Sequence, residues 1–195
     1  MRPSFVSLFL AFLCAGILIP VFAEAPENLK QVPVKDLITE ANQQIEDVKM
    51  WTASGDTYKE KEDDIRRTAG VLAVLGQAIQ DHPEAKSQKI SGMGLRDAAL
   101  KLAKSKGPTD SVNAMKDIQA AQEGIPNMRK TFTARKDLIG MDDLMHVVNT
   151  LNAKLRRSAR RSRDPEADSR NALVIAMLSR TMAEQGEDYL SEEAE

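Results

Sequence analysis

Apolar side chains follow their longest regular pattern in residues 137–163. The apolar residues of this stretch recur every three or four positions and are Leu138, Met141, Leu144, Met145, Val148, Leu151, Leu155 and Ala159. On a helix of about seven turns, this spacing places them along one continuous stripe. The pattern predicts a long amphipathic helix, and we expect the fold to be organised around its apolar stripe.

The same spacing predicts further helices on both sides of this stretch, most of them ending near a proline or a glycine. We expect these helices at residues 33–53, 57–82, 84–106, 109–122 and 165–186. Residues 127–136 are compatible with either helix or loop, and no alternating run of β-branched residues predicts a strand. Long helices joined by short breaks are typical of antiparallel bundles. We therefore predict an all-α fold, an antiparallel up-down bundle of five to six helices.

The composition of the chain supports this fold class. Aromatic residues make up only 4% of the 195 residues, so a core must be built from Leu, Ile, Val, Ala and Met, as is common where helix packs on helix. The length suffices for one domain with a substantial core. We predict a single helical-bundle domain at residues 33–186 and an acidic, frayed tail at residues 187–195.

Residues 1–23 have the pattern of a secretory signal peptide. Arg2 precedes an apolar stretch at residues 6–19, and Ala23 ends a small-residue cleavage site. We predict cleavage after Ala23 and an extended leader at residues 24–32, with an uncleaved anchor helix as the alternative. Cleavage would remove Cys14, the only cysteine, so the mature chain is expected to lack disulfides and a transmembrane span.

The two histidines of the chain do not predict a metal site. His82 precedes Pro83 at an expected helix end, where an imidazolium would face free backbone carbonyl groups. His146 follows Asp143 by three positions, a spacing similar to the Glu-x-x-His motif of di-iron bundles. At about 100° per residue, however, His146 lies roughly 160° from the centre of the apolar stripe. Asp143 and His146 are therefore both expected on the polar face of their helix.

Asn152 is the polar residue of residues 137–163 that we expect to be buried. It lies roughly 40° from the centre of the apolar stripe. A buried Asn can fix the register between packed helices at some cost in stability. The sequence therefore predicts a specificity role for Asn152 in the core.

The layout of the chain resembles the periplasmic four-helix-bundle cytochromes of the c-prime and soluble b types. A signal peptide, Ala- and Lys-rich helices, few aromatics and Gly-Pro breaks carry this resemblance. The family's Cys-x-x-Cys-His attachment motif is absent, and a b-type site would need an inward Met that faces an inward His. Met50, Met141, Met145 and Met177 are candidates, but both histidines are poorly placed. The resemblance therefore implies the scaffold, and we expect no cofactor.

The densest positive charge of the chain follows the apolar stripe. Six cationic residues fall within residues 154–163, namely Lys154, Arg156, Arg157, Arg160, Arg161 and Arg163. Such a run can simply complement the dipole at a helix C-terminus. Alternatively, it is a docking patch for phospholipid headgroups, an acidic polysaccharide or an acidic protein. Self-association through the acidic tail of a neighbouring copy is a further possibility.

Several function classes are disfavoured by these observations. A net charge of −2 and the lack of interleaved aromatics argue against nucleic acid as the partner. Catalysis is not expected, because the sequence offers no thiol in the mature chain and no convincing nucleophile–base pair. We predict an exported, non-catalytic protein that binds or scaffolds at the cell envelope, with a haem-b or metal-binding electron-transfer bundle as the alternative. The absence of an Asn-x-Ser/Thr acceptor favours a bacterial periplasmic or secreted protein.

Overall fold

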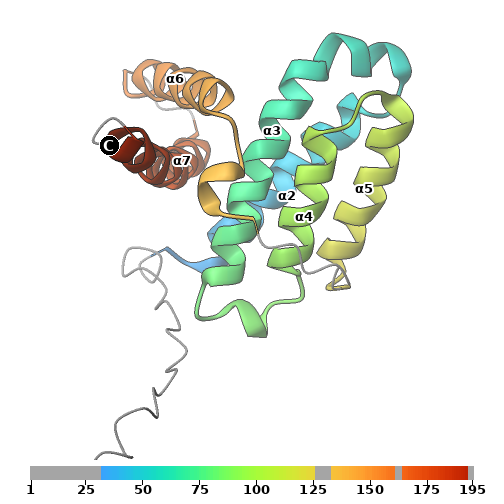
Figure 1. The fold of residues 1–195 in the computed structure, drawn as a ribbon, viewed down its shortest axis with the longest axis horizontal. Coiled ribbons are helices and arrows are strands. Elements are labelled where there is room, and N and C mark those ends of the chain that lie inside the picture. Colours follow the sequence, from blue (N-terminus) through green and yellow to red (C-terminus); the bar gives the residue numbers. More distant parts are fainter. Residues whose placement is uncertain (1–31, 126–132, 161–163, 193–195) are drawn as a thin grey trace, which may run out of the picture.

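A computed structural model describes residues 32–125, 133–160 and 164–192 of the chain, with side chains up to residue 186. These residues form six α-helices and two short 3-10 turns, η1 (Ala85–Ser87) and η2 (Arg135–Asp137) (Figure 1). The helices are α2 (Val34–Trp51), α3 (Gly55–Asp81), α4 (Gly92–Ala103), α5 (Pro108–Gln122), α6 (Met141–Ser158) and α7 (Pro165–Glu192). No strand occurs in the described ranges, so the predicted all-α class is confirmed.

Local sequence signals account for the ends of α2 and α3. Pro33 lies at the N-cap of α2, just outside the helix, where a proline does not interrupt the backbone hydrogen bonds. Ser54 caps α3, because its hydroxyl accepts a hydrogen bond from the backbone N–H of Thr57 at 3.1 Å. His82 and Pro83 end α3 close to the predicted position. The helices expected at residues 33–53 and 57–82 are therefore found within about two residues at each end.

The helix expected at residues 84–106 is shorter than predicted. Its first part contains the turn η1, and α4 begins only at Gly92. Ser91 caps α4, because its hydroxyl accepts a hydrogen bond from the backbone N–H of Gly94. Gly92 is needed there because α3 and α4 touch through their backbones. A Cβ atom added to Gly92 would lie 2.7 Å from the carbonyl oxygen of Gly76, and one added to Gly76 would lie 2.6 Å from the amide nitrogen of Arg96.

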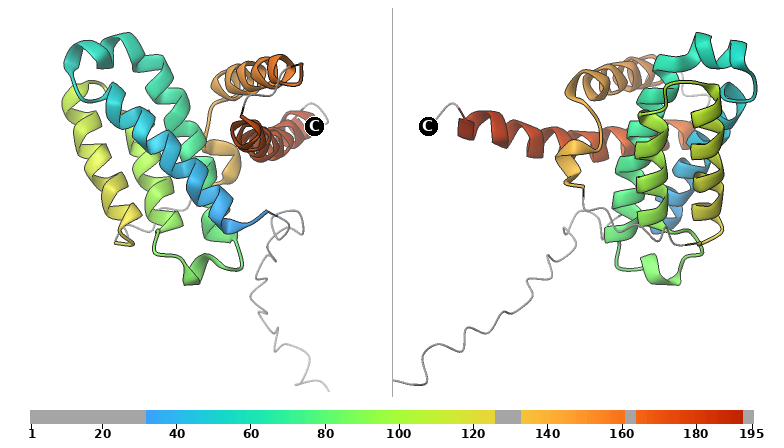
Figure 2. Two further views of the ribbon diagram at one scale, coloured as in Figure 1. Left: turned by 180° about the vertical axis from the view of Figure 1, so that it is seen from behind. Right: turned by 45° about the vertical axis from the view of Figure 1, so that its right-hand side comes forward.

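The six helices do not form one continuous up-down bundle. Helices α2, α3, α4 and α5 pack side by side in chain order, with contacts between each consecutive pair. Helices α6 and α7 form a hairpin of their own that lies across α3 (Figures 1 and 2). The hairpin is joined to the rest mainly through α3, so the architecture is a four-helix body with a crossing helical pair.

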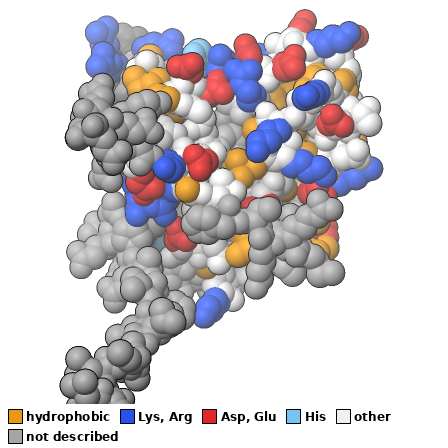
Figure 3. Space-filling model, in the orientation of Figure 1, with side chains coloured by type: hydrophobic (Ala, Val, Ile, Leu, Met, Phe, Trp, Pro, Cys, Tyr) orange, Lys and Arg blue, Asp and Glu red, His pale blue; other side chains and the backbone are white. Residues whose placement is uncertain are grey.

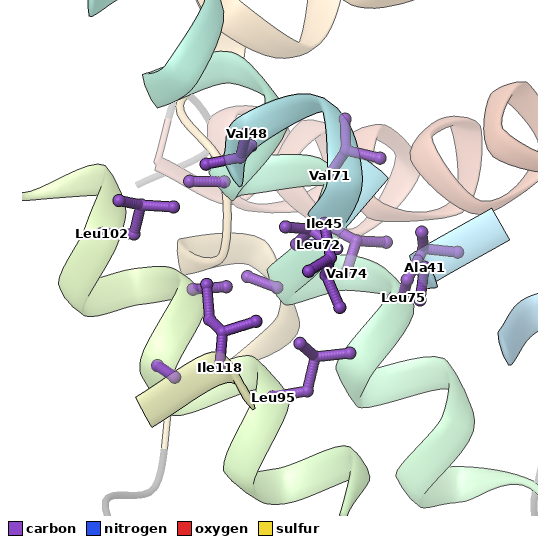
Figure 4. Packing of buried hydrophobic residues seen from close by; sticks show 14 of the residues in the cluster. Ala41, Ile45, Val48, Val71, Leu72, Val74, Leu75, Leu95, Leu102 and Ile118 are labelled. Atoms are coloured by element: carbon purple, nitrogen blue, oxygen red, sulfur yellow. The ribbon is translucent and has the colours of Figure 1, made fainter. Parts of the chain in front are cut away.

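The core is centred on α3 and not on the helix within residues 137–163. Thirteen residues of α3 are buried, whereas only Leu144 and Val148 are buried in α6. Figure 4 shows Leu72 of α3 between Ile45 of α2 and Leu95 of α4. The expected organising role of residues 137–163 is therefore wrong. Helix α6 is a peripheral element, because neighbouring helices cover only part of its apolar stripe.

Two further expectations for this stretch are also wrong. Asn152 is exposed and cannot fix a helix register in the core. Met145, expected to face inward, has 41% of its surface exposed. The helix itself ends at Ser158, and Arg161 and Arg163 lie outside the described residues.

The ends of the chain are only partly described. The predicted signal peptide at residues 1–23 and nearly all of the predicted leader at residues 24–32 lie outside the described residues. At the other end, α7 continues past Gly186 to Glu192, so residues 187–192 of the expected frayed tail are helical, and residues 193–195 lie outside the described residues. Of the helices that the structure describes, none combines the length and the apolar character that crossing a membrane requires.

Candidate functional site

An open groove of about 260 Å³ lies where α2, α3, α6 and α7 meet. Val71, Val147, Leu151 and Val174 form its apolar part. Around them lie groups that can form hydrogen bonds, including Gln44, Asp47, Thr68, Thr150 and Lys154. A mixture of apolar surface and a few converging polar groups is typical of ligand sites.

Trp51, the only tryptophan of the chain, lines this groove. It lies at the C-terminal end of α2 and is half-buried. The Nζ atom of Lys61, from α3, lies 5.9 Å from the centre of the indole ring, which is within the range of a cation–π contact. In the sequence, Trp51 lies near the end of the helix expected at residues 33–53, a position that suits a packing anchor. Its place in a groove depends on α6, which lies about a hundred residues further along the chain.

A second hollow, of about 660 Å³, lies between the start of α2 and α7. It contains no aromatic side chain. Its only arginine, Arg170, already lies 3.7 Å from the buried carboxylate of Glu40 and 3.9 Å from Glu166. The groove beside Trp51 therefore offers the richer set of groups for recognition.

The α6 wall of the groove is joined to α3 by an ion pair. The guanidinium of Arg66 donates to both carboxylate oxygens of Asp143, at 2.9 and 3.0 Å, and Arg67 lies 3.4 Å from the same carboxylate. Hydrogen bonding from Arg66 lowers the pKa of Asp143 below its usual value. The positive charges of Arg66 and Arg67 act in the same direction, against the opposing effect of burial. Asp143 thus fastens α6 to α3.

Asp143→Asn is expected to lower the free energy of unfolding by about 0.5–1 kcal/mol at about pH 7, a small loss because Arg66 is solvated. A carboxylate with a lowered pKa stabilises the fold above its ordinary pKa, and this contribution disappears as the pH falls through the lowered value. Urea unfolding should therefore show the variant approaching the wild type as the pH falls below the ordinary carboxyl pKa of about 3.9. The exposed neighbour Asp142 forms no ion pair in the described structure, so Asp142→Asn is the control. An equal loss of unfolding free energy in the two variants would contradict the role of Asp143 in fastening α6 to α3.

The cationic end of α6 begins beside the groove. Lys154, Arg156, Arg157 and Arg160 are all exposed, and none forms an ion pair within the part of the chain that the structure describes. Only Arg157 has a hydrogen bond, from its Nε atom to the carbonyl oxygen of Ala153 at 3.1 Å. Figure 3 shows Lys and Arg side chains gathered over this end of the molecule, at the upper left. Four of the six predicted patch residues are thus described and lie together.

The acidic end of α7 lies away from this patch. Gln185 of α7 donates to the carbonyl oxygen of Ile139 at 2.8 Å, which places the last part of α7 beside the start of α6. The hydroxyl of Ser158, at the other end of α6, donates to Asp168 near the start of α7. Because the two helices are antiparallel, the last part of α7 lies at the end of α6 that is opposite to the cations.

His82 has a structural role that differs from the predicted one. It is buried, the backbone N–H of Glu84 donates to its Nδ1 atom at 3.1 Å, and its Nε2 atom lies 3.0 Å from the carbonyl oxygen of Val32. These contacts suit a neutral ring that accepts at Nδ1 and donates from Nε2. The expected imidazolium facing helix carbonyls is therefore wrong. His82 instead holds the segment before α2 against the end of α3.

The remaining candidates for a metal or haem site are not brought together. His146 is exposed on α6, as its position on the polar face predicts, and it lines the groove. Met50 and Met145 are exposed, at 61% and 41%. In residues 32–125, 133–160 and 164–186, no three or more His, Cys, Asp or Glu side chains are placed to hold a metal ion.

A polar network that no sequence pattern indicates joins η2, α3 and α7. Arg135 of η2 donates to Asp81 of α3 and to Glu184 of α7, both at 2.6 Å. Arg180 also approaches Glu184, and burial together with the charge of Arg135 lowers the pKa of Arg180. No spacing in the sequence indicates these pairs, which are 49 and 54 residues apart. Their role is to hold α7 and η2 on α3.

Comparison of the chain with protein-family models, with curated proteins and with solved structures gave no match. Function is therefore inferred from two adjoining features of this molecule. One is the groove beside Trp51, and the other is the cationic end of α6, formed by Lys154, Arg156, Arg157 and Arg160.

Proposed function

We propose that this protein is an exported, non-catalytic protein that binds an anionic partner at the cell envelope through the cationic end of α6. One observation carries the proposal: four exposed cations lie within seven residues of one helix end, and no acidic side chain of the described structure pairs with them. Like charges held together repel one another, and the uncompensated field attracts anionic surfaces. A partner that supplies negative charge relieves this repulsion.

The structural role of the other arginines supports this choice of surface. Arg66, Arg96, Arg135 and Arg170 all have carboxylate partners within the described structure. They hold elements of the fold to one another or stabilise single helices. The cations at the end of α6 contribute no comparable contact between elements. Their clustering is thus better explained by a partner outside the chain than by the fold.

Export is the second part of the proposal and rests on the sequence pattern of residues 1–23. Cleavage after Ala23 would release a mature chain without cysteine. The expected location is the periplasm or the surroundings of a bacterial cell. The anionic partner would then be found among envelope lipids, acidic polysaccharides and acidic proteins, including the acidic tail of a second copy.

No specific observation favours a haem-b or metal-binding bundle over this function. His82 uses both ring nitrogens for backbone groups, and His146 is on the exposed face of α6. The resemblance to periplasmic four-helix cytochromes remains a proposal about scaffold alone. The non-catalytic assignment rests on the lack of a convincing nucleophile–base pair in the sequence.

The chain is to be expressed with its N-terminal segment in a bacterium and purified from the exported fraction, where its intact mass should correspond to a start at Glu24. Binding to immobilised dextran sulfate, a linear polyanion, is then measured at low and high salt. The variant Arg156→Gln/Arg157→Gln/Arg160→Gln is expected to bind about tenfold more weakly than the wild type. High salt should weaken wild-type binding, since it screens exposed charges.

The matched control is Lys35→Gln/Lys59→Gln/Lys116→Gln, which removes the same charge from three scattered exposed positions. Equal binding by the two triple variants would show that net charge, and not the end of α6, is responsible, and would overturn the proposed site. A full-length chain that stays in the cytoplasm would overturn export. Sedimentation velocity at both salt concentrations shows whether the partner is a second copy.

A further inference from the structure

We infer that the groove beside Trp51 binds an acidic sugar unit of a polysaccharide, with the sugar ring against Trp51 and its carboxylate at Lys154. This inference deepens the proposed function, on which it rests, by naming the class of anionic partner. It is carried by the contrast between the two walls of the groove. The α6 wall provides an unpaired cation, and the α2 wall provides an aromatic ring and hydrogen-bond acceptors.

The α2 wall suits the hydroxyl groups of a sugar. Asp47 is half-buried and forms no ion pair in the described structure, and its carboxylate accepts one hydrogen bond there, from Gln43 at 3.3 Å. Gln44 donates its amide N–H to Glu40 at 2.7 Å, which leaves the amide oxygen of Gln44 as an acceptor. Carboxylate and amide oxygens accept hydrogen bonds from hydroxyl groups. This wall therefore favours a ligand with several O–H donors.

Trp51 adds a surface for the ring of the sugar. Its indole is half-buried and lines the groove, and Lys61 lies over the ring at 5.9 Å from its centre, which leaves one face for a ligand. A large amphipathic ring that is fixed by packing binds apolar surface at little cost in conformational entropy. The C–H groups on one side of a sugar ring provide such an apolar surface. Trp51 thus recognises the ring and not its charge.

The α6 wall supplies the positive charge for a carboxylate. Lys154 is exposed, lines the groove and has no hydrogen bond or ion pair in the described structure. Thr150, one helical turn before it, adds a hydroxyl group on the same wall. By contrast, Arg67 and Asp64 on the α3 side are already engaged, with Asp64 at 3.1 Å from Lys61 and 3.7 Å from Arg67. Lys154 is therefore the cation available to a ligand.

The arrangement of charges distinguishes a sugar acid from other anions. An acidic peptide with closely spaced carboxylates would place negative charge against Asp47, which is unfavourable. A lipid acyl chain needs an enclosed apolar cavity, whereas this groove is open and has charged and polar side chains beside its apolar part. A uronic acid has one carboxylate and several hydroxyl groups on the same ring. It can face Lys154 and Asp47 at the same time.

The cations beyond the groove fit a polymer of such units. Arg157 follows Lys154 by one helical turn, so the row of positive charge continues along α6 from the mouth of the groove. A linear polysaccharide with one carboxylate per sugar could therefore occupy the groove with one unit and lie along the end of α6 with the next. This continuity links the groove to the proposed anionic partner.

Calorimetric titration of the purified chain with tri-galacturonate tests the inference, and the fully methyl-esterified trisaccharide is the uncharged counterpart. The variant Lys154→Gln is expected to bind about tenfold more weakly, since it removes one charge-assisted contact. The ester lacks all three carboxylates and should bind at least as weakly as the variant does. Trp51→Leu should weaken binding by a similar factor of about ten through the lost ring contact. Lys116→Gln, an exposed lysine on α5, should bind like the wild type.

Fluorescence gives a second readout, because Trp51 is the only tryptophan. Its emission should shift when tri-galacturonate is added to the wild type or to Lys116→Gln, and should not shift at the same concentration for Lys154→Gln. Lys154 is exposed, so this variant is expected to remain folded, which thermal unfolding checks. Absence of trisaccharide binding, equal binding by the two Lys variants, or equally tight binding of oligo-glutamate would each overturn the inference.

The two proposals fail in different ways. If dextran sulfate binding depends on Arg156, Arg157 and Arg160 but tri-galacturonate does not bind, the proposed function stands and the acidic sugar is wrong. If tri-galacturonate binds in the groove but the triple Arg variant binds dextran sulfate as tightly as the wild type does, the sugar site is supported. The proposal that the end of α6 binds the anionic partner is then wrong.

Discussion

Gly76→Ala is expected to lower the free energy of unfolding by about 3 kcal/mol or more, because the added methyl group would collide with the backbone of a neighbouring helix. The added Cβ atom would lie 2.6 Å from the amide nitrogen of Arg96 and 2.9 Å from the carbonyl oxygen of Gly92. Both are backbone atoms of α4, so no side chain can rotate out of the way. Helix α4 would have to move away from α3, and Leu95, which is fully buried, would lose its packing.

Urea unfolding followed by circular dichroism measures this effect. Gly186→Ala is the matched control, because Gly186 lies within α7 and a Cβ atom there would meet no atom within 4 Å. In an open helical position, replacing Gly with Ala should leave the free energy of unfolding unchanged or raise it by up to about 1 kcal/mol. The same substitution is thus expected to have opposite effects at the two sites. A Gly76→Ala protein as stable as the wild type would show that α3 and α4 are not in backbone contact.

Leu72→Ala is expected to cost about 3 kcal/mol, within the range for a large-to-small change at a fully buried site. Leu72 has no exposed surface and lies in the middle of α3, where α2 and α4 pack around it. Leu151→Ala, in the apolar stripe of α6, should cost less than about 1 kcal/mol because Leu151 is only half-buried. The two variants remove the same atoms, so burial is the main difference between them.

The comparison tests which helix organises the fold. Urea unfolding of both variants at the same pH gives the two free-energy differences directly. A loss at Leu151 as large as that at Leu72 would restore residues 137–163 as the centre of the core. A small loss at both positions would indicate that neither helix is tightly packed.

There is a physical reason why the sequence pattern made α6, and not α3, look like the central helix. A helix at the edge of a core has one apolar face, and its periodic pattern is easily recognised in a sequence. A helix that is covered on most sides has no such contrast. Residues 68–76 of α3 are buried without interruption, so the most important helix had a weaker pattern than α6. The length of the apolar stripe in residues 137–163 was therefore a poor guide to how deeply that helix is buried.

The site shows a similar division. The cationic residues Lys154, Arg156, Arg157 and Arg160 were evident from the sequence, because they are close together along the chain. The groove was not, since Trp51 and Lys154 are far apart in the sequence and line one groove only when α6 packs against α3. The ion pair of Asp143 with Arg66 was missed for the same reason, as its partners are 77 residues apart.

The sequence by itself determined the all-α class, the approximate ends of α2, α3 and α5, and the run of positive charge at the end of α6. These properties depend on contacts within a few residues, such as helix capping, chain breaks at proline and helical periodicity. Only the tertiary structure decided that α3 is the centre of the core, that Gly76 and Gly92 bring two backbones together, and that Trp51 and Lys154 line the same groove. Each of these depends on which helices become neighbours, and periodicity along a single helix carries no information about its neighbours.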